Sequence, residues 1–389
     1  MQHEAKELSP VEPPVGIGQT IGRRIKEARK ALRLNLDELA PRIGLSIGQL
    51  SKIENGKAVA SIQSLVKLGG ALQRPVGYFL QADSDMPRCL GTLVPAWDTE
   101  ARALKRFAEL VTDATTGGLS IAVFSASQLG SATGQVEALM TGLIDIFVEN
   151  LSFFGDYAEA ARPVSLPFCF ETEAHQEAFA RSDLFEREIR NVLRKSQIEL
   201  LPLTWRRGPT LVIVGREPAW SPSDLRGRKV RSSESEVLIK YLEAFGATPV
   251  VVPWARVYEA FEAGEFDTMI TNLSHVVSMR FTRIAKFVSL LNYRPLDLTF
   301  AVNLQRNRML APSFQNTVRE ALVTAGQYCA QLLEEAANEV DDLSETDGAI
   351  FSRIPNTSWR ERSQAVIAEI EEKGYWRKGL LQEIRALSS

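Results

Sequence analysis

The sequence predicts a multidomain protein in which an all-α domain precedes a larger α/β body. In residues 20–80 apolar residues recur at helical spacing, and single turn residues separate the helical stretches. From residue 90 onward, short apolar runs alternate with amphipathic helical stretches, which is typical of a sheet covered by helices. A length of 389 residues is enough for two or three domains.

We expect four segments along the chain. Residues 1–19 are polar and contain prolines, which favours a flexible arm. Residues 20–80 form the all-α domain, called the head below. Residues 81–89 break the helical pattern with Asp, Ser and Pro and are interpreted as a linker, after which residues 90–389 form the body.

The formal charge is unevenly distributed between these segments. The whole chain carries a net charge of −3, whereas residues 21–80 contain 11 Lys and Arg against 4 Asp and Glu. The head is therefore basic and the rest of the chain is acidic. This asymmetry indicates a head that binds a polyanion, although a solvated, charged helix surface would give the same count.

Apolar periodicity outlines the first two helices of the head. The first apolar face contains Ile21, Ile25, Ala28 and Leu32, and the seam continues through Leu36, Leu39, Ala40 and Ile43. Residues at this spacing share one side of a helix, so they predict the core of a small helical domain.

Capping residues predict a sharp corner between the second and third helices. Asn35 followed by Glu38 is similar to a capping box at the start of the second helix. Gly44 ends that helix, Ser46 can cap the third, and Gly56 ends the third. A connection of about three residues is what a helix-turn-helix requires, because its second helix must enter the major groove of DNA.

This stretch resembles the Cro and phage-repressor family (XRE type) of helix-turn-helix domains. The resemblance is carried by LDELAPRIGLSIGQLSKIENGK (36–57) and by the trailing Leu65, Leu72 and Phe79. It implies double-stranded operator DNA as a partner. The candidate DNA-binding residues are Asn35, Ser46, Ile47, Gly48, Gln49, Lys52, Asn55 and Lys57.

The resemblance also suggests individual contacts. Gln49 can pair with an adenine edge, Lys52 with guanine or phosphate, and Ile47 with a thymine methyl group. Leu36 departs from the family, which often has a phosphate-binding Gln there, so one backbone contact is in doubt. The alternative is a protein-interaction domain of the same helical fold.

The body contains nine candidate strands and several helices between them. We expect the strands at 90–95, 119–125, 144–148, 198–203, 210–215, 228–232, 248–253, 267–272 and 298–304. Helices are expected at 98–115 and 235–246, and residues 313–340 and 357–386 are almost wholly helical. The alternation predicts a parallel or mixed sheet covered on both faces.

Three patches of the body resemble the solute-binding proteins of TRAP-type transporters (DctP-like). They are LVTDATTGGLSIAVFSASQLGSATGQVEALMTGLIDIFV (110–148), SLPFCFETEAHQEAF (165–179) and SPSDLRGRKVRSSESEVLIKYLEAFGATPVVVPWARVYEAFEAGEFDTMITN (221–272). The resemblance implies a periplasmic-binding-protein-like (type II) fold, with two α/β lobes joined by a hinge that close over a ligand.

Arg231 is the main ligand-binding candidate. The resemblance matches it to an arginine that clamps the ligand carboxylate, and a guanidinium can take both carboxylate oxygens in fixed geometry. The implied ligand is therefore a small organic acid; the alternative is a surface arginine paired with a glutamate. The other ligand-binding candidates are Asn150, Trp205, Arg207, Thr210, Trp254, Thr271 and Asn272.

Several classes of protein and site are not expected. The three cysteines are far apart and there is no CxxC pair, so neither a disulfide framework nor a structural zinc site is predicted. No apolar run reaches 18 residues and the first residues lack a secretory signal, so we expect a cytoplasmic protein without membrane contact. No nucleophile motif or cofactor loop is recognised, so we expect neither an enzyme nor a cofactor.

Together these features predict a ligand-responsive, one-component transcriptional regulator. A homodimer is expected, because one head reads only a half-site of a palindrome. The long C-terminal helices can supply the dimer seam or can cover the sheet. The alternatives are the solute-binding component of a TRAP-type transport system and a protein-interaction scaffold.

Overall fold

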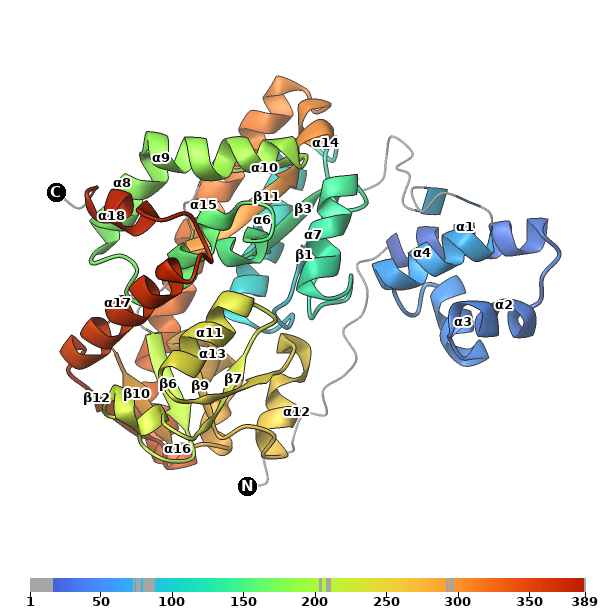
Figure 1. Ribbon diagram of the computed structural model, residues 1–389. Coiled ribbons are helices and arrows are strands. Elements are labelled where there is room, and N and C mark those ends of the chain that lie inside the picture. The colour runs from blue at the N-terminus through green and yellow to red at the C-terminus, as the bar shows by residue number, and fades with distance from the viewer. Residues whose placement is uncertain are drawn as a thin grey trace.

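A computed structural model of the protein describes residues 17–72, 74, 78–79, 88–202, 205–207, 211–291, 293 and 297–387. Most of the expected arm, most of the expected linker and the ligand candidate Thr210 lie outside these residues. The described part comprises the helical head and an α/β body built on two sheets (Figure 1).

Among its described residues, the head contains the helices α1 (Ile17–Ala31), α2 (Leu36–Ile43), α3 (Ile47–Glu54) and α4 (Ile62–Ala71). Because α1 begins at Ile17, the helical domain starts three residues earlier than expected. The predicted apolar seam is buried at Ile21, Ile25, Ala28, Leu39, Ala40 and Ile43. Leu36 is half-buried, and Leu32 is 39% exposed because it follows the end of α1.

The α2–α3 corner has the predicted caps. The backbone N–H of Asn35 donates to Glu38 Oε2 (2.6 Å), and Gly44 ends α2 with a left-handed φ of 72°. At the start of α3, Ser46 Oγ accepts from the backbone N–H of Gln49 (3.2 Å). These contacts satisfy backbone groups that helix ends leave unpaired and so fix the turn.

A buried ion pair that the sequence did not predict joins α1 to α3. The Nε and Nη2 atoms of Arg29 donate to the two carboxylate oxygens of Glu54 at 2.6 and 2.7 Å. The side chains are only 10% and 3% exposed. This bidentate pair fixes α3 against α1 and leaves the outer face of α3 free.

The first sheet forms one lobe of the body. Its strands are β1 (Arg88–Thr92), β2 (Ile121–Phe124), β3 (Ile146–Glu149), β4 (Ile198–Leu200), β5 (Trp205–Arg206) and β11 (Asp297–Asn303). The order is β2-β1-β3-β11-β4, with β5 also pairing with β11. The first three strands are parallel, and β11 runs antiparallel to its neighbours.

The second sheet forms the other lobe, in the order β12-β10-β6-β9-β7-β8. Its strands are β6 (Leu211–Gly215), β7 (Lys229–Ser232), β8 (Thr248–Val251), β9 (Thr268–Asn272), β10 (Phe287–Leu290) and β12 (Ile350–Arg353). Only β6 is antiparallel to its neighbours β9 and β10, so this sheet is also mixed.

Helices cover both sheets. They are α6 (Thr99–Ala114), α7 (Ala132–Thr141), α8 (Glu173–Arg181), α9 (Asp183–Phe185), α10 (Asn191–Lys195), α11 (Glu236–Ala244), α12 (Val257–Glu262), α13 (Leu273–Ser278), α14 (Leu304–Arg308), α15 (Pro312–Asn338), α16 (Val340–Asp347), α17 (Thr357–Glu372) and α18 (Leu380–Arg385). Short 3-10 or π turns are η1 (Leu151–Phe154), η2 (Glu159–Ala161), η3 (Pro163–Ser165), η4 (Glu186–Arg190), η5 (Pro222–Leu225), η6 (Trp254–Arg256) and η7 (Phe281–Arg283).

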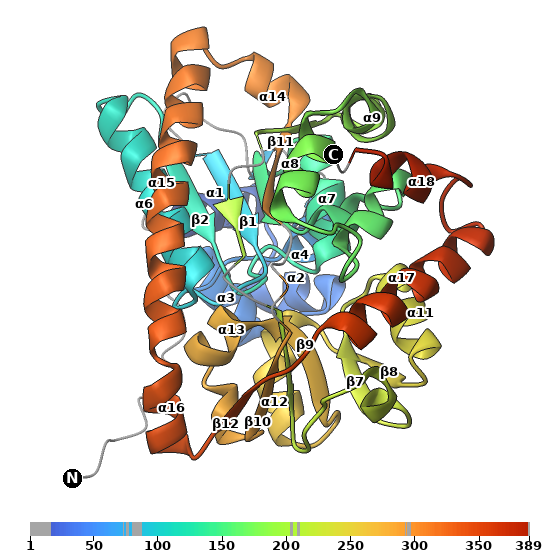
Figure 2. The ribbon, with the colours of Figure 1, turned by 90° about the vertical axis from the view of Figure 1, so that its left-hand side faces the viewer.

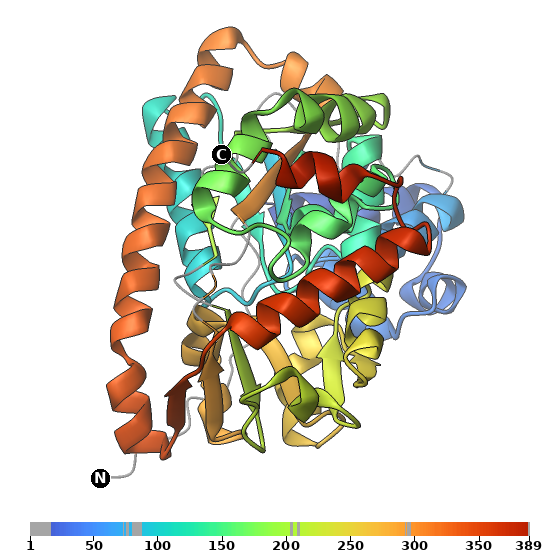
Figure 3. The ribbon, with the colours of Figure 1, turned by 60° about the vertical axis from the view of Figure 1, so that its left-hand side comes forward.

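The C-terminal helices tie the two lobes together. Helix α15 has 27 residues, a length of about 40 Å, and runs along both lobes beside α6 and α13 (Figure 2). Helix α17 packs near α11 and leads to α18, which returns to the first lobe (Figure 3). The apolar faces of α15 and α17 are buried within the chain. Of the two roles considered for these helices, the structure favours covering the sheets.

Every one of the nine expected strands overlaps an observed strand. Strand β1 begins at Arg88, so the last two residues of the expected linker belong to the body. The strands β5 (Trp205–Arg206), β10 (Phe287–Leu290) and β12 (Ile350–Arg353) were missed. Cys89, Cys169 and Cys329 are free and buried. Among the described residues, no helix is both long and apolar enough to cross a bilayer.

Candidate functional sites

A cavity of about 180 Å³ lies between the two lobes. The first lobe contributes the end of β3 and the turn η1, and the second contributes residues of β7, β9, α11 and α13. An apolar cavity of about 150 Å³ is enough to bind benzene, so this space suits a small organic molecule. Its lining combines charged groups with an apolar wall.

Arg231, on β7, lines the cavity as a positively charged group. Its Nε and Nη2 atoms donate to the carbonyl oxygen of Val252 at 3.1 and 2.8 Å. No described carboxylate lies within ion-pair distance of this guanidinium. Burial lowers the pKa of Arg231 to about 10, although Glu149 and Glu234 oppose the shift. The group remains a cation at neutral pH.

Trp254 holds two of the polar groups in the cavity. Its ring lies under the Arg231 guanidinium, with 5.2 Å between Cζ and the ring centroid. It also lies 4.7 Å from the imidazole of His275, between ring centroids. A cation above an indole face is electrostatically favourable, so Trp254 fixes the orientation of Arg231.

Arg207 also lines the cavity, but carboxylates of the protein already neutralise it. Its Nη2 donates to Glu149 Oε2 at 2.7 Å and to Glu100 Oε2 at 3.1 Å. All three side chains are less than 10% exposed. Burial opposes the charge of Arg207, whereas the two carboxylates raise its pKa above the ordinary value.

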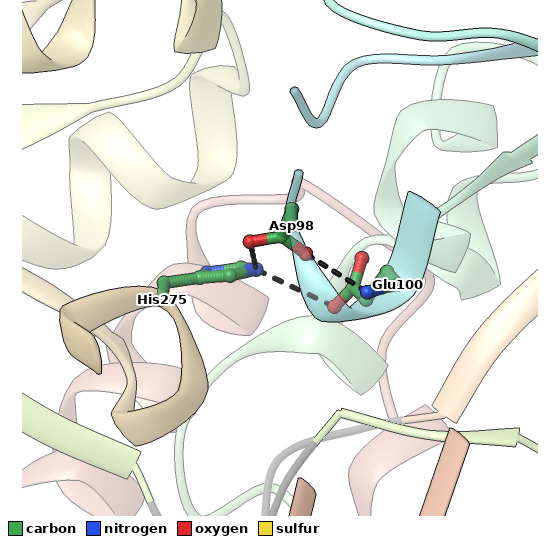
Figure 4. A group of neighbouring side chains, drawn as sticks. All are labelled: Asp98, Glu100 and His275. Atoms are coloured by element: carbon green, nitrogen blue, oxygen red, sulfur yellow. Dashed lines mark hydrogen bonds and ion pairs between the residues drawn. The ribbon is translucent and has the colours of Figure 1, made fainter. Parts of the chain in front are cut away.

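Asp98, Glu100 and His275 form a buried cluster beside Arg207. Figure 4 shows the imidazole approaching both carboxylates, with His275 Nε2 3.4 Å from Glu100 Oε1 and 4.0 Å from Asp98 Oδ2. Burial raises the pKa of Asp98. Burial also opposes ionisation of Glu100, but Arg207 and His275 lower the pKa of this carboxyl below its usual value. Asp98 and Glu100 precede or begin α6 in the first lobe, whereas His275 lies in α13 of the second, so the cluster joins the lobes.

The structure brings six of the eight expected ligand-binding residues to this cavity. They are Asn150, Arg207, Arg231, Trp254, Thr271 and Asn272. Trp205 was wrongly expected there: it is fully buried, its Nε1 donates to the Leu322 carbonyl oxygen of α15 (2.7 Å), and its ring packs on Phe300. Thr210 lies outside the described residues.

Several lining residues were missed by sequence reasoning. Glu149 and His275 are the charged ones, and Ser233, Ser235 and Tyr293 are among the polar ones. The position of Glu149 at the end of a strand in a candidate α/β sheet was a usable signal.

Part of the cavity lining is apolar. It includes Leu93, Leu166, Val237, Leu238 and Leu242. An apolar surface of this kind favours a ligand with an apolar part, because burying apolar surface contributes about 25 cal/mol per Å². The cavity lining therefore combines charged groups with apolar side chains.

The outer face of α3 is the candidate nucleic-acid interface of the head. Ser46, Ile47, Gly48, Gln49 and Lys52 are all exposed there, as are Asn35, Asn55 and Lys57 around it. Two of the candidates also have local structural roles. Gln49 Oε1 accepts from the backbone N–H of Ser46 (2.9 Å), and Asn55 Nδ2 donates to the Ser51 carbonyl oxygen (2.8 Å).

Comparison with known families decides the class of the body. Residues 90–373 match the model of bacterial extracellular solute-binding proteins, family 7. The chain belongs to this family. The head, residues 25–79, matches the model of helix-turn-helix domains. Both resemblances found in the sequence are thereby confirmed.

Two solute-binding proteins are similar to this family 7 chain in sequence. The 2,3-diketo-L-gulonate-binding periplasmic protein of Escherichia coli is 27% identical over 245 residues, which are 63% of this chain and 74% of the relative. A C4-dicarboxylate-binding periplasmic protein of Shewanella loihica is 21% identical over 69% of this chain and 80% of its own length.

Solved structures show that the two-lobed fold is shared. A TRAP periplasmic solute-binding protein of Roseobacter denitrificans with bound L-galactonate aligns with a TM-score of 0.68 at 20% identity, covering 79% of this chain and 100% of its own. One of Sulfurospirillum deleyianum with bound succinate gives a TM-score of 0.69 at 20% identity, covering 78% and 100%. These matches confirm the predicted fold class.

Proposed function

We propose that this family 7 protein is a one-component transcriptional regulator that binds operator DNA through its head and senses an organic acid between its lobes. The observation that carries the sensing part is the Arg231 guanidinium, which faces the cavity without a carboxylate partner among the described residues. Arg231 is half-buried, and a cation withdrawn from water is costly unless an anion pairs with it. A ligand carboxylate supplies that anion with two hydrogen bonds.

The ligand is an acid with an apolar tail. The carboxylate binds at Arg231 near Asn272, and the tail lies along Val237, Leu238 and Leu242. The structural neighbours named above hold L-galactonate or succinate, which carry polar groups at both ends. The leucine-rich wall here supports a ligand with more exposed carbon than either of these.

Lobe closure transmits the signal to the head. The ligand must bind the closed form more tightly than the open form, because only differential affinity shifts the equilibrium. Helix α4 of the head lies near α7 of the body, and α7 lies near η1, whose Ser152 and Phe153 line the cavity. This continuous path supports coupling between cavity and head. Two such heads in a homodimer would read a palindromic operator.

The proposed setting is the cytoplasm, because the proposed partner of the head is DNA. Binding without catalysis is sufficient for this function, so we propose neither an enzymatic reaction nor an organic cofactor. The exposed face of α3, with Gln49 and Lys52, supports contact with base edges and phosphates.

The main alternative is a binding component of a transport system. It is favoured by the names of the relatives, which are periplasmic binding proteins. The helix-turn-helix match at residues 25–79 favours regulation instead. Detection of the protein in the periplasm of its native cells would support the transport role.

Thermal-shift screening of the full chain tests the sensing part. Each carboxylic acid of a panel is paired with its neutral amide, which has the same shape without the charge. We expect an acid with an apolar tail, such as hexanoate, to raise the melting temperature while hexanamide leaves it unchanged. Equal shifts for acid and amide, or stabilisation by sugars alone, would refute a carboxylate ligand.

A further inference from the structure

The structure points to a binding site for a divalent transition metal of the zinc type, formed by Asp98, Glu100 and His275. The site lies where the two lobes meet, beside the ligand cavity (Figure 4). One imidazole nitrogen and two carboxylate oxygens are a donor set that zinc accepts, with further positions left for water or ligand. No pair of Cys or His at short spacing marks the site in the sequence, because His275 is far from Asp98 and Glu100 along the chain.

The separation of the donor atoms fits one shared ion. One donor atom from each residue lies within 4.8 Å of the other two. Zinc bonds of about 2.1 Å in a tetrahedron place neighbouring donor atoms about 3.4 Å apart. The distance from His275 Nε2 to Glu100 Oε1 is 3.4 Å, and that from Nε2 to Asp98 Oδ2 is 4.0 Å. Small side-chain rotations would bring all three to one ion.

Two of the donor atoms are buried without a hydrogen-bond partner. They are Glu100 Oε1 and His275 Nε2, and their residues are 1% and 4% exposed. Unpaired polar atoms at this depth are costly, and buried polar groups are nearly always satisfied. These two atoms face each other, so a cation between them satisfies both at once.

Each proposed metal ligand is oriented by a contact of its own. His275 Nδ1 lies 3.1 Å from Thr271 Oγ1, which leaves Nε2 for the metal. Glu100 is held through its other oxygen by Arg207 (3.1 Å), and Ser278 Oγ donates to Asp98 Oδ2 (2.8 Å). Outer contacts that fix the ring and carboxylates are a general feature of metal sites.

The charge around the cavity also favours a bound dication. When ionised, the carboxyls of Asp98, Glu100 and Glu149 bring three negative charges, whereas Arg207 and Arg231 bring two positive ones. With a neutral imidazole the group is anionic, which disfavours a second anion nearby. A bound dication makes the net charge of the group positive, which favours binding of an anion nearby. This coupling to the organic acid rests on the proposed function, whereas the metal site itself does not.

Zinc titration of the full chain tests the site without any organic acid. The protein is stripped with a chelator, and bound zinc is measured after dialysis. We expect one equivalent per chain, lost in His275→Gln and kept in the control His175→Gln, because His175 is a buried histidine that contacts the Ile384 carbonyl instead. Absence of zinc binding by the wild-type chain, or equal binding by His275→Gln, would overturn the proposal.

Cobalt substitution and a second variant distinguish loss of the metal site from loss of folding. Cobalt bound at such a site gives visible absorption bands that report nitrogen and oxygen ligands in a low-coordinate geometry. Glu100→Gln keeps the size of the side chain and a carbonyl oxygen for Arg207, so it should fold while binding zinc at least tenfold more weakly. Unchanged zinc affinity and cobalt bands in this variant would contradict the assignment. Zinc binding that persists when no carboxylate stabilises the protein would refute only the sensing function.

Discussion

Arg231, near the end of β7, and Trp254, just after the parallel strand β8, meet at the cavity, with the guanidinium carbon 5.2 Å from the centre of the indole ring. The same guanidinium donates from Nε and Nη2 to the Val252 carbonyl oxygen. These contacts fix the Nε and Nη2 side of the guanidinium and leave its other N–H groups to a ligand. A cation held in this way loses little conformational entropy when an anion binds.

Two substitutions of Arg231 should separate the contribution of its charge to carboxylate affinity from that of its hydrogen-bond geometry. Arg231→Ala removes a charge-assisted contact of about 1.5–3 kcal/mol, so carboxylate affinity should fall about tenfold to a hundredfold. Arg231→Lys keeps the positive charge but cannot offer two parallel N–H groups, and it should also bind weakly. Isothermal titration with an acid that stabilises the wild type gives both affinities. Wild-type affinity in Arg231→Ala would show that the carboxylate binds elsewhere.

Leu238 should select for the tail of the ligand. Leu238→Ala shortens the apolar wall and should weaken binding of an acid with a six-carbon chain by several-fold, since each buried CH₂ contributes about 0.8 kcal/mol. A short acid such as acetate, which does not reach this wall, provides the comparison. If both acids lost affinity equally, Leu238 would be acting on the whole fold and not on the tail.

The buried pair between Arg29 and Glu54 should determine the stability of the head. Glu54→Gln leaves the Arg29 charge without a partner, and breaking a buried pair typically costs about 3–5 kcal/mol. The control is Glu27→Gln, which removes the exposed Arg23–Glu27 pair, with side chains 56% and 52% exposed. That change should cost less than about 1 kcal/mol. Urea unfolding followed by circular dichroism compares the two, and equal losses would contradict this role.

Gln49 should contact DNA as well as cap its helix. Gln49→Glu retains the side-chain oxygen that accepts from the Ser46 N–H, so α3 should remain stable. The variant loses the amide donor and gains a negative charge, so affinity for a preferred DNA sequence should fall at least tenfold. Gln63→Glu on α4 makes the same charge change at another exposed position. Fluorescence anisotropy with labelled DNA measures both, and an equal loss in the control would indicate a purely electrostatic effect.

Lys52 should act on all DNA sequences alike. A lysine that contacts phosphate contributes through counterion release, so Lys52→Ala should weaken binding to random and preferred DNA to a similar degree. The slope of log K against log salt should decrease by about one. An unchanged salt slope together with altered sequence preference would place Lys52 at a base edge instead.

Local patterns were sufficient to predict the head and most strands of the body. The caps at Asn35, Gly44 and Ser46 depend on neighbouring residues, and such contacts can be recognised in a sequence. The missed strand β5 has only two residues, and β12 is an edge strand without a buried residue, so neither gives a clear apolar pattern.

The candidate site was predictable only where a motif carried it. Arg231 and Asn272 lie in the patch that resembles the family, and both line the cavity. Trp205 was misplaced because a tryptophan near a hinge can face the ligand or the core, and packing against α15 decides between them. Long-range contacts such as that between Glu100 and His275 depend on how the two lobes meet, which no local pattern encodes.

The most direct test of the regulatory claim is DNA selection by the full chain, followed by titration with the acid that stabilises it. Sequences enriched from a random pool at physiological salt are measured by anisotropy with and without that acid. We predict an enriched palindromic site whose affinity changes several-fold with the acid in the wild type, and Arg231→Ala should bind the same site without responding. If no sequence is enriched, or the acid leaves DNA affinity unchanged in the wild type, the chain is not a ligand-responsive regulator.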